Sequence, residues 1–240
     1  MLDFTSQTTS QAKYKANSST YDAGLRDYMQ KVFNNMGIAL AITGIVSFIT
    51  ANSPALINAI FGSPLKWLVM LAPLGFIFFL SAKINSISAS KAKTYLWIFS
   101  GLMGLSLAPI FLMYTGASIA RAFFVTSSLF GAMSLYGYTT KKDLTAMGSF
   151  MMMGLIGLII ASLVNLFLQS SGLQFALSIL TVIIFTGLTA YDVQKIKSLY
   201  YQFAGNAEAI SKAATMGALS LYMDFINIFL AILRLFGERR

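Results

Sequence analysis

The sequence contains neither cysteine nor histidine, and only eight of its 240 residues are acidic. Without cysteine there is no disulfide framework and no thiolate metal site, and without histidine there is no imidazole ligand or base. A Ser-His-Asp triad, a Cys-His pair and an HExxH zinc site are therefore excluded. Proton chemistry in this chain falls to Asp, Glu, Lys, Tyr or water.

Charge of either sign is scarce. Charged residues make up 10% of the chain, against about 25% in soluble domains, while hydrophobic residues make up 57% and the mean hydropathy is +0.71. Runs of about 20 apolar residues indicate transmembrane helices, so the expected partner is the lipid bilayer. The net charge of +9 does not indicate nucleic-acid binding, because the basic residues stand in short clusters between the apolar runs.

Seven apolar segments predict the fold, and each can cross about 30 Å of hydrocarbon at 1.5 Å per residue. They lie at 33–51, 66–83, 94–114, 118–139, 145–168, 173–192 and 213–236. The fold class is therefore an all-α membrane protein, a seven-helix transmembrane bundle. It forms a single domain at 32–240, after a polar cytoplasmic tail at 1–31 that is no signal peptide. We expect the tail to begin as irregular chain, with a short interfacial helix at 21–31, and the 193–212 connection to be the one long loop.

The basic residues predict the orientation. If all seven segments cross, twelve of the 17 Lys and Arg residues lie on the side of the N-terminus. They are Lys13, Lys15, Arg26, Lys31, Lys83, Lys91, Lys93, Lys141, Lys142, Lys195, Lys197 and Lys212. This bias favours a cytoplasmic N-terminus and an external C-terminus. In the alternative, the last segment re-enters the membrane and returns its arginines to the cytoplasmic side.

Asp224 is a candidate functional residue because it interrupts an apolar segment. It lies about 16 Å into the last segment, where a charged carboxylate costs about 2.5–3.5 kcal/mol. Small and polar residues recur at spacings of four and three along this helix, which places them on one face. They are Ala213, Gly217, Ser220, Asp224, Asn227, Ala231 and Arg234. We expect this face to line a cavity or contact a neighbouring helix; the alternative is a structural aspartate bonded to that helix.

Asp192 is the second candidate. It ends the sixth segment, near the cytoplasmic interface, and Thr189 lies on the same polar edge. An interfacial acid balanced by Lys195 is the alternative. Because the connection between segments six and seven is cytoplasmic, the two can lie antiparallel and bring Asp192 close to Asp224. Two carboxylates in a low-dielectric site resist ionising together, so such a pair would exchange a proton as the pH changes.

The same pair, when deprotonated, would be a weak Ca²⁺ site. A full calcium cage takes about 6–8 oxygens, so Asn227, backbone carbonyls and water would have to supply the rest. Weak and partly hydrated binding suits a permeation path, where an ion has to leave as well as enter.

Four motifs resemble the bacterial, YccA-like branch of the Bax inhibitor-1 (transmembrane Bax-inhibitor-motif) family. They are "YDAGLRDYMQKVF" at 21–33, "TKKDL" at 140–144, "AYDVQKI" at 190–196 and "ALSLYMDFINIFLAILRLFG" at 218–237. The two motifs that contain Asp192 and Asp224 are the most specific. The resemblance covers nearly the whole chain.

The resemblance implies a multi-pass protein of the bacterial inner membrane, with the last helix central and wrapped by the other six. It implies a pH-sensitive Ca²⁺ leak, gated by Asp192 and Asp224, with no cofactor and no enzymatic activity; Ca²⁺ and H⁺ are the ions it handles. A basic residue after the second helix latches the first of these acids in the family, and Lys83 in "FFLSAKIN" is the nearest match. Lysine cannot form the bidentate fork of an arginine. The branch is also linked to control of a membrane-bound ATP-dependent protease.

The mechanistic hypothesis is electrostatic. At low pH the pair is protonated and Lys83 neutralises residual charge. Loss of the proton leaves two repelling carboxylates, which shift the packing of segments six and seven and change access to the cavity.

Three other functions share individual features with this sequence. An intramembrane aspartyl protease also carries two aspartates on adjacent helices, but it needs GxGD at the second acid, where this chain has "LYMD", and no PAL follows. A retinal protein needs a lysine inside the last segment, and Lys212 stands only at its end. A non-transporting regulator that acts on the protease through its tail and loops is the main alternative to the leak channel.

Overall fold

The computed structural model describes the backbone of residues 4–84 and 86–240, and side chains from residue 23 onward. This part of the chain is helical, without strands. The helices are α1 (Phe4–Ala51), α2 (Pro54–Phe61), α3 (Leu65–Lys83), α4 (Ala89–Met113), α5 (Gly116–Thr139), α6 (Thr145–Leu168), α7 (Ser171–Gln202) and α8 (Ala207–Phe236). Seven of these helices are long and apolar enough to cross a membrane, which confirms the predicted fold class.

The short helix α2 is the one element that hydropathy did not predict. Ser53 caps it by accepting a hydrogen bond from the backbone N–H of Leu56 at 3.4 Å, and Pro54 occupies its first turn. A serine cap followed by proline is a strong local start signal. With eight residues, α2 is too short to cross a membrane and connects α1 to α3.

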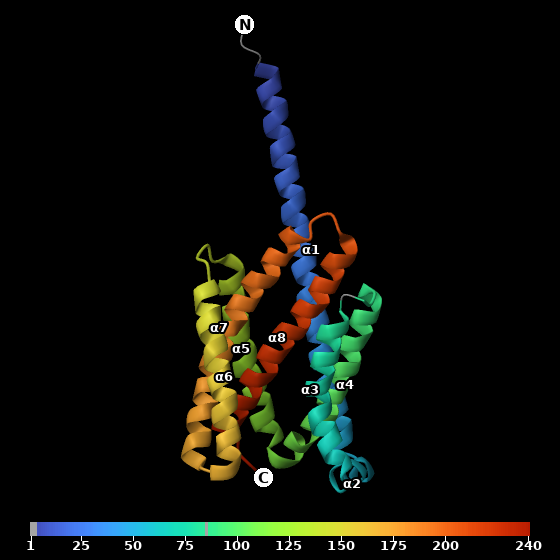
Figure 1. Ribbon diagram of the computed structural model, residues 1–240, viewed down its shortest axis with the longest axis vertical. Coiled ribbons are helices and arrows are strands. Elements are labelled where there is room, and N and C mark those ends of the chain that lie inside the picture. The colour runs from blue at the N-terminus through green and yellow to red at the C-terminus, as the bar shows by residue number, and fades with distance from the viewer. Residues whose placement is uncertain (1–3, 85) are drawn as a thin grey trace.

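Two three-helix groups flank the last helix (Figure 1). The α1 group consists of α1, α3 and α4, and the α5 group consists of α5, α6 and α7; within each group the helices pack on one another. Helix α8 packs against α1 and α4 on one side and against α5 and α7 on the other. It is also the most buried of the seven spans. The bundle is therefore organised around α8, with α3 and α6 at the periphery.

Two predicted boundaries differ from the structure. The 193–212 connection is mostly helical, because α7 runs on to Gln202 and α8 starts at Ala207. Hydropathy falls at Lys195 and Lys197, which is why the segment was predicted to end before them. The helix continues because Val193 and Ile196 are buried on one face of it. Asp192 therefore lies ten residues before the end of α7, deeper in the bundle than predicted.

The predicted tail also contains more structure than its composition indicates. Residues 1–3 lie outside the described residues, and α1 is continuous from Phe4, where irregular chain was expected. Extending an existing helix costs less than nucleating a new one. Leu25, Tyr28 and Met29, from the predicted interfacial helix, pack in the hydrophobic core.

The two chain ends lie at opposite ends of the bundle (Figure 1). We call the end that carries the α3–α4, α5–α6 and α7–α8 connections the N-side, and the other end the C-side. Helix α8 is continuous over 30 residues, so the re-entrant alternative is not observed. Which side faces the cytoplasm stays a prediction from the basic residues.

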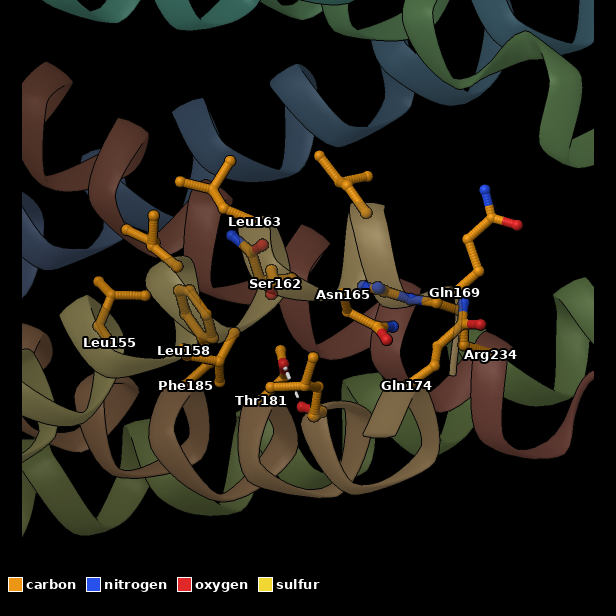
Figure 2. Close-up of a pocket in the computed structure, with 14 residues that line it drawn as sticks. Leu155, Leu158, Ser162, Leu163, Asn165, Gln169, Gln174, Thr181, Phe185 and Arg234 are labelled. Carbon is orange, nitrogen blue, oxygen red and sulfur yellow. Dashed lines mark hydrogen bonds between the residues drawn. The ribbon is translucent and has the colours of Figure 1, made fainter. Parts of the chain in front are cut away.

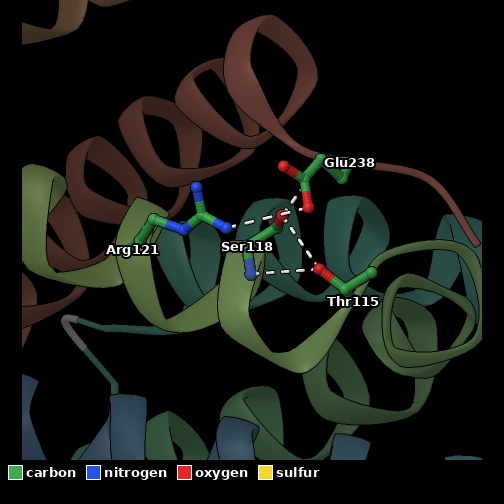
Figure 3. A network of polar contacts seen from close by, with 4 residues as sticks. All are labelled: Thr115, Ser118, Arg121 and Glu238. Carbon is green, nitrogen blue, oxygen red and sulfur yellow. Dashed lines mark hydrogen bonds and ion pairs between the residues drawn. The ribbon is translucent and has the colours of Figure 1, made fainter.

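A C-terminal clasp, residues 237–240, holds the end of α8 on the C-side (Figure 3). The backbone N–H of Glu238 donates to the Ser118 hydroxyl at 3.0 Å, and its carbonyl accepts from the N–H of Thr115 at 3.1 Å. Its carboxylate lies 3.7 Å from the guanidinium of Arg121. The backbone contacts fix α8 relative to the start of α5, while the ion pair is exposed and contributes little.

Candidate intramembrane aspartate site

The small and polar face of α8 lies against α7, as the spacing predicted. Gly217 leaves room for Ile196, whose side chain would lie 3.0 Å from a Cβ atom at that position. One turn further, the Ser220 hydroxyl donates a hydrogen bond to Asp192 Oδ2. The sixth and seventh spans thus meet at Asp192 through Ser220, a residue of the predicted polar face, whereas the described residues show no hydrogen bond between Asp192 and Asp224.

Asp224 is enclosed by the protein. Its side chain is 4% exposed, and Oδ2 has no hydrogen-bond partner among the described residues. Ser220, which donates to Asp192, stands one turn before Asp224 on α8, so the two acids belong to neighbouring turns of the α7–α8 contact. Lys195 stands one turn beyond Asp192 on α7, towards the N-side. A buried carboxylate oxygen without a donor is unfavourable, and such groups are concentrated at functional sites.

The other predicted residues lie around this pair with separate roles. Thr189 is fully buried, and its hydroxyl donates to the Phe185 carbonyl at 2.7 Å. The Asn227 amide donates to the Met223 carbonyl at 2.8 Å, and its side chain reaches a C-side cavity. Among the described residues, neither of these two side chains forms a hydrogen bond with Asp192 or Asp224.

Lys83 lies apart from the aspartates. It is exposed at the end of α3, which packs against α4 and α2 rather than α7. No ion pair joins Lys83 to a carboxylate in the described part of the chain. The latch therefore stays a prediction, for a conformation in which α3 and α7 approach one another.

The opposite face of α8 carries an anchor that the sequence analysis missed. The Tyr222 hydroxyl lies 2.8 Å from the Thr43 hydroxyl of α1. Thr43 in turn donates to the Ser100 carbonyl of α4 at 2.9 Å. Tyr222 is fully buried, edge-on to Phe99 with ring centroids 5.5 Å apart. The sequence analysis missed Tyr222 because a hydropathy profile counts tyrosine as an apolar residue. A buried tyrosine hydroxyl nevertheless needs a hydrogen-bond partner.

A cavity of about 680 Å³ adjoins the site on the C-side, between α6, α7 and α8 (Figure 2). Asn227, which lines it, stands one turn from Asp224. Among the residues that the structure describes, no group of three or more acidic side chains could hold a metal ion. Any divalent cation at the aspartates would thus have two carboxylates and a hydroxyl, far fewer than the oxygens of a full calcium cage.

These features define a class of protein: a polytopic helical membrane protein that packs two three-helix groups around a buried, acid-bearing last helix. The chain belongs to the family described as inhibitor of apoptosis-promoting Bax1, the Bax inhibitor-1 family, whose model matches residues 25–240. The resemblance inferred from the motifs is confirmed.

Relatives of similar length extend this result. The Rickettsia prowazekii protein RP147 is 49% identical over 240 residues, which is 100% of both chains. The inner membrane protein YbhL of Escherichia coli is 44% identical over 220 residues, covering 91% of this chain and 94% of that one. A Caulobacter vibrioides protein is 42% identical over 228 residues, 91% of each chain. The chain is accordingly a membrane protein, and one relative is named for the inner membrane.

Proposed function

We propose that this protein is a pH-sensitive calcium-permeable leak channel of the bacterial inner membrane, with a cytoplasmic N-terminus and no enzymatic activity. Asp192 and Asp224 are its proton sensor and gate. The observation that carries the proposal is the buried Asp224 carboxylate, which has an oxygen without a partner among the described residues and stands one turn from Ser220, the residue bonded to Asp192. A membrane helix with such a group is less stable than one without it, so a functional reason for the acid is favoured.

The mechanism follows from the hydrogen bond between Ser220 and Asp192, which joins α8 to α7 on the N-side of Asp224. When both carboxylates are charged, their repulsion in a poorly solvated site opposes this contact. Protonation of one carboxylate removes the repulsion. The number of protons bound by Asp192 and Asp224 thus alters how tightly α7 packs on α8. This packing in turn controls whether an ion can reach the C-side cavity beside Asn227.

Calcium flux into proteoliposomes tests this proposal. We expect the flux of the unmodified protein to vary with pH, and the pH dependence to disappear in Asp192→Asn and Asp224→Asn, because neither variant can form the repelling pair of carboxylates that protonation relieves. An entrapped fluorescent Ca²⁺ indicator reports the rate. Asp143→Asn is the matched control, since Asp143 lies in the exposed α5–α6 connection and accepts hydrogen bonds only from Thr145. If the flux and its pH dependence survive both intramembrane substitutions, the sensor proposal is wrong.

The second candidate function is regulation of a membrane-bound ATP-dependent protease without transport. One observation favours it: the first part of α1 extends well beyond the bundle (Figure 1), where a large soluble partner has access to it.

Deletion of residues 1–22 separates the two functions. If the extension serves a protease, the truncated protein keeps its Ca²⁺ flux but no longer changes the rate at which the co-reconstituted protease degrades a membrane substrate. The deleted stretch of α1 extends beyond the bundle in Figure 1, whereas Leu25 and the core residues that follow it are retained, so we expect the bundle to keep its contacts. Loss of flux with retained protease control would contradict this division of roles.

A further inference from the structure

Close glycine contacts join α6 to α7 along the first ten residues of α6, and a crevice lies further towards the C-side. Gly148 lies directly against the ring of Tyr191. Gly154 would place a Cβ atom 3.1 Å from Ile184, and Gly187 of α7 would place one 3.1 Å from Met151. Beyond Gly154 no comparable glycine contact occurs, and α6 leaves space between itself, α7 and α8.

The crevice is elongated and has two chemically different ends (Figure 2). Its volume of about 680 Å³ is in the range of small-molecule sites. From Leu155 to Gln169 it follows α6 for about 21 Å at 1.5 Å per residue, which exceeds the roughly 15 Å of hydrocarbon in one leaflet. Leu155, Leu158 and Phe185 line the end near the bundle centre.

Polar side chains line the other end. Gln169, Gln174 and Arg234 gather there in Figure 2, and Arg234 is the one charged residue in the lining. Its Nε donates to the Leu230 carbonyl at 3.1 Å, and no carboxylate pairs with it in the described part of the chain. Among the described residues, no acceptor is hydrogen-bonded to the other guanidinium nitrogens. A guanidinium matches the geometry of a phosphate, which accepts two parallel hydrogen bonds from it.

The crevice also opens towards lipid. The most apolar stretch of α6 has none of its residues buried within the protein, and Phe167, near the polar end, is 88% exposed. A molecule that diffuses in the bilayer can therefore enter sideways between α6 and α8.

We propose that this crevice binds an anionic phospholipid of the C-side leaflet. Its phosphate lies on Arg234, flanked by the amides of Gln169 and Gln174, and one acyl chain lies along the apolar end. A soluble anion would leave the apolar end empty, and a lipid without net negative charge would leave the charge of Arg234 uncompensated. The crevice is the same cavity that the channel proposal places beside Asn227. Lipid binding is nevertheless measured without ion flux, so failure of this proposal can be distinguished from failure of the channel proposal.

Native mass spectrometry of the full-length protein tests the site. The protein is released from bilayers of equal parts dioleoylphosphatidylglycerol, which is anionic, and dioleoylphosphatidylcholine, which has no net charge. We expect retained phosphatidylglycerol to exceed phosphatidylcholine, and Arg234→Gln to reduce the retained phosphatidylglycerol about tenfold, the loss expected for a charge-assisted hydrogen bond. Arg234→Lys should keep most of it. Arg121→Gln is the matched control, because it removes the same charge from the same side without touching the crevice.

A second variant makes the test independent of Arg234. Ser162 lines the middle of the crevice, so Ser162→Trp should fill it and reduce both lipids while the arginine remains. If Arg234→Gln does not yield folded protein, the loss of lipid from Ser162→Trp supports the site. The proposal is overturned by any of three results: unchanged phosphatidylglycerol in either crevice variant, an equal loss in Arg121→Gln, or equal retention of both lipids by the unmodified protein.

Discussion

Replacement of Asp224 by asparagine is expected to raise the melting temperature of the protein at neutral pH, by about 5 °C. The reason is that the Asp224 carboxylate is buried and one of its oxygens has no donor. Leaving such a group unsatisfied costs about 1–3 kcal/mol, and 1 kcal/mol corresponds to about 2–4 °C in a chain of this length. Thermal unfolding of the detergent-solubilised protein, followed by tryptophan fluorescence, measures the change.

The comparison with Asp192 makes this prediction specific. Asp192 is half-buried and accepts a hydrogen bond from Ser220, so Asp192→Asn weakens an existing contact and should lower the melting temperature. The two substitutions remove the same charge and are expected to act in opposite directions. A destabilising Asp224→Asn would mean that Asp224 has a partner in the folded protein. A stabilising Asp192→Asn would mean that relief of charge repulsion outweighs the loss of the contact with Ser220. Stability gained on removing a functional group is the usual sign of a site kept for activity.

Replacement of Gly137 by valine is expected to have the largest effect on folding. A Cβ atom at Gly137 would lie 2.9 Å from the Cα of Ala190, so the new side chain would meet the backbone of α7. A helix backbone cannot move aside as a side chain can, and the cost should exceed the roughly 1–3 kcal/mol of ordinary overpacking. We expect a melting temperature lower by about 10 °C, or no folded protein in a size-exclusion profile.

Gly131 provides the matched control on the same helix. A Cβ atom at Gly131 would have no atom within 4 Å, so Gly131→Val should leave the melting temperature nearly unchanged. Equal effects of the two substitutions would show that helix propensity, rather than the α5–α7 contact, determines the outcome. Because Ala190 precedes Asp192 by two residues, a displaced α7 would also displace the aspartate site.

The spans and the inward face of α8 could be predicted because both depend on local patterns. Hydropathy identified the seven spans because a long apolar segment within lipid has to satisfy its backbone hydrogen bonds internally, and a helix does so without a neighbour. The spacing of Gly217, Ser220 and Asp224 identified the face that meets α7. Both signals are contained in a single helix and do not depend on its neighbours.

The remaining features depend on which helices become neighbours. Lys195 suggested that α7 ends at the membrane surface, whereas its helix continues because Ile196 packs under α8. Gly137 has no distinguishing context in the sequence, and its importance arises from the proximity of Ala190. The role of the Tyr222 hydroxyl cannot be predicted from α8 alone, because it depends on the Thr43 hydroxyl of α1 as its neighbour. Lys83 was predicted as the latch from the family resemblance, and it lies exposed at the end of α3, which packs mainly on α4.

The central position of α8 has a consequence for biosynthesis. The helix on which both three-helix groups pack is translated after the other six spans, so these spans enter the membrane before their common partner exists. In that interval the Thr43 hydroxyl of α1 lacks Tyr222, and Asp192 of α7 lacks Ser220. Polar groups in lipid without partners are unfavourable. A ribosome that stalls before α8 would therefore release an open, polar-faced intermediate that membrane quality control can distinguish from the finished bundle.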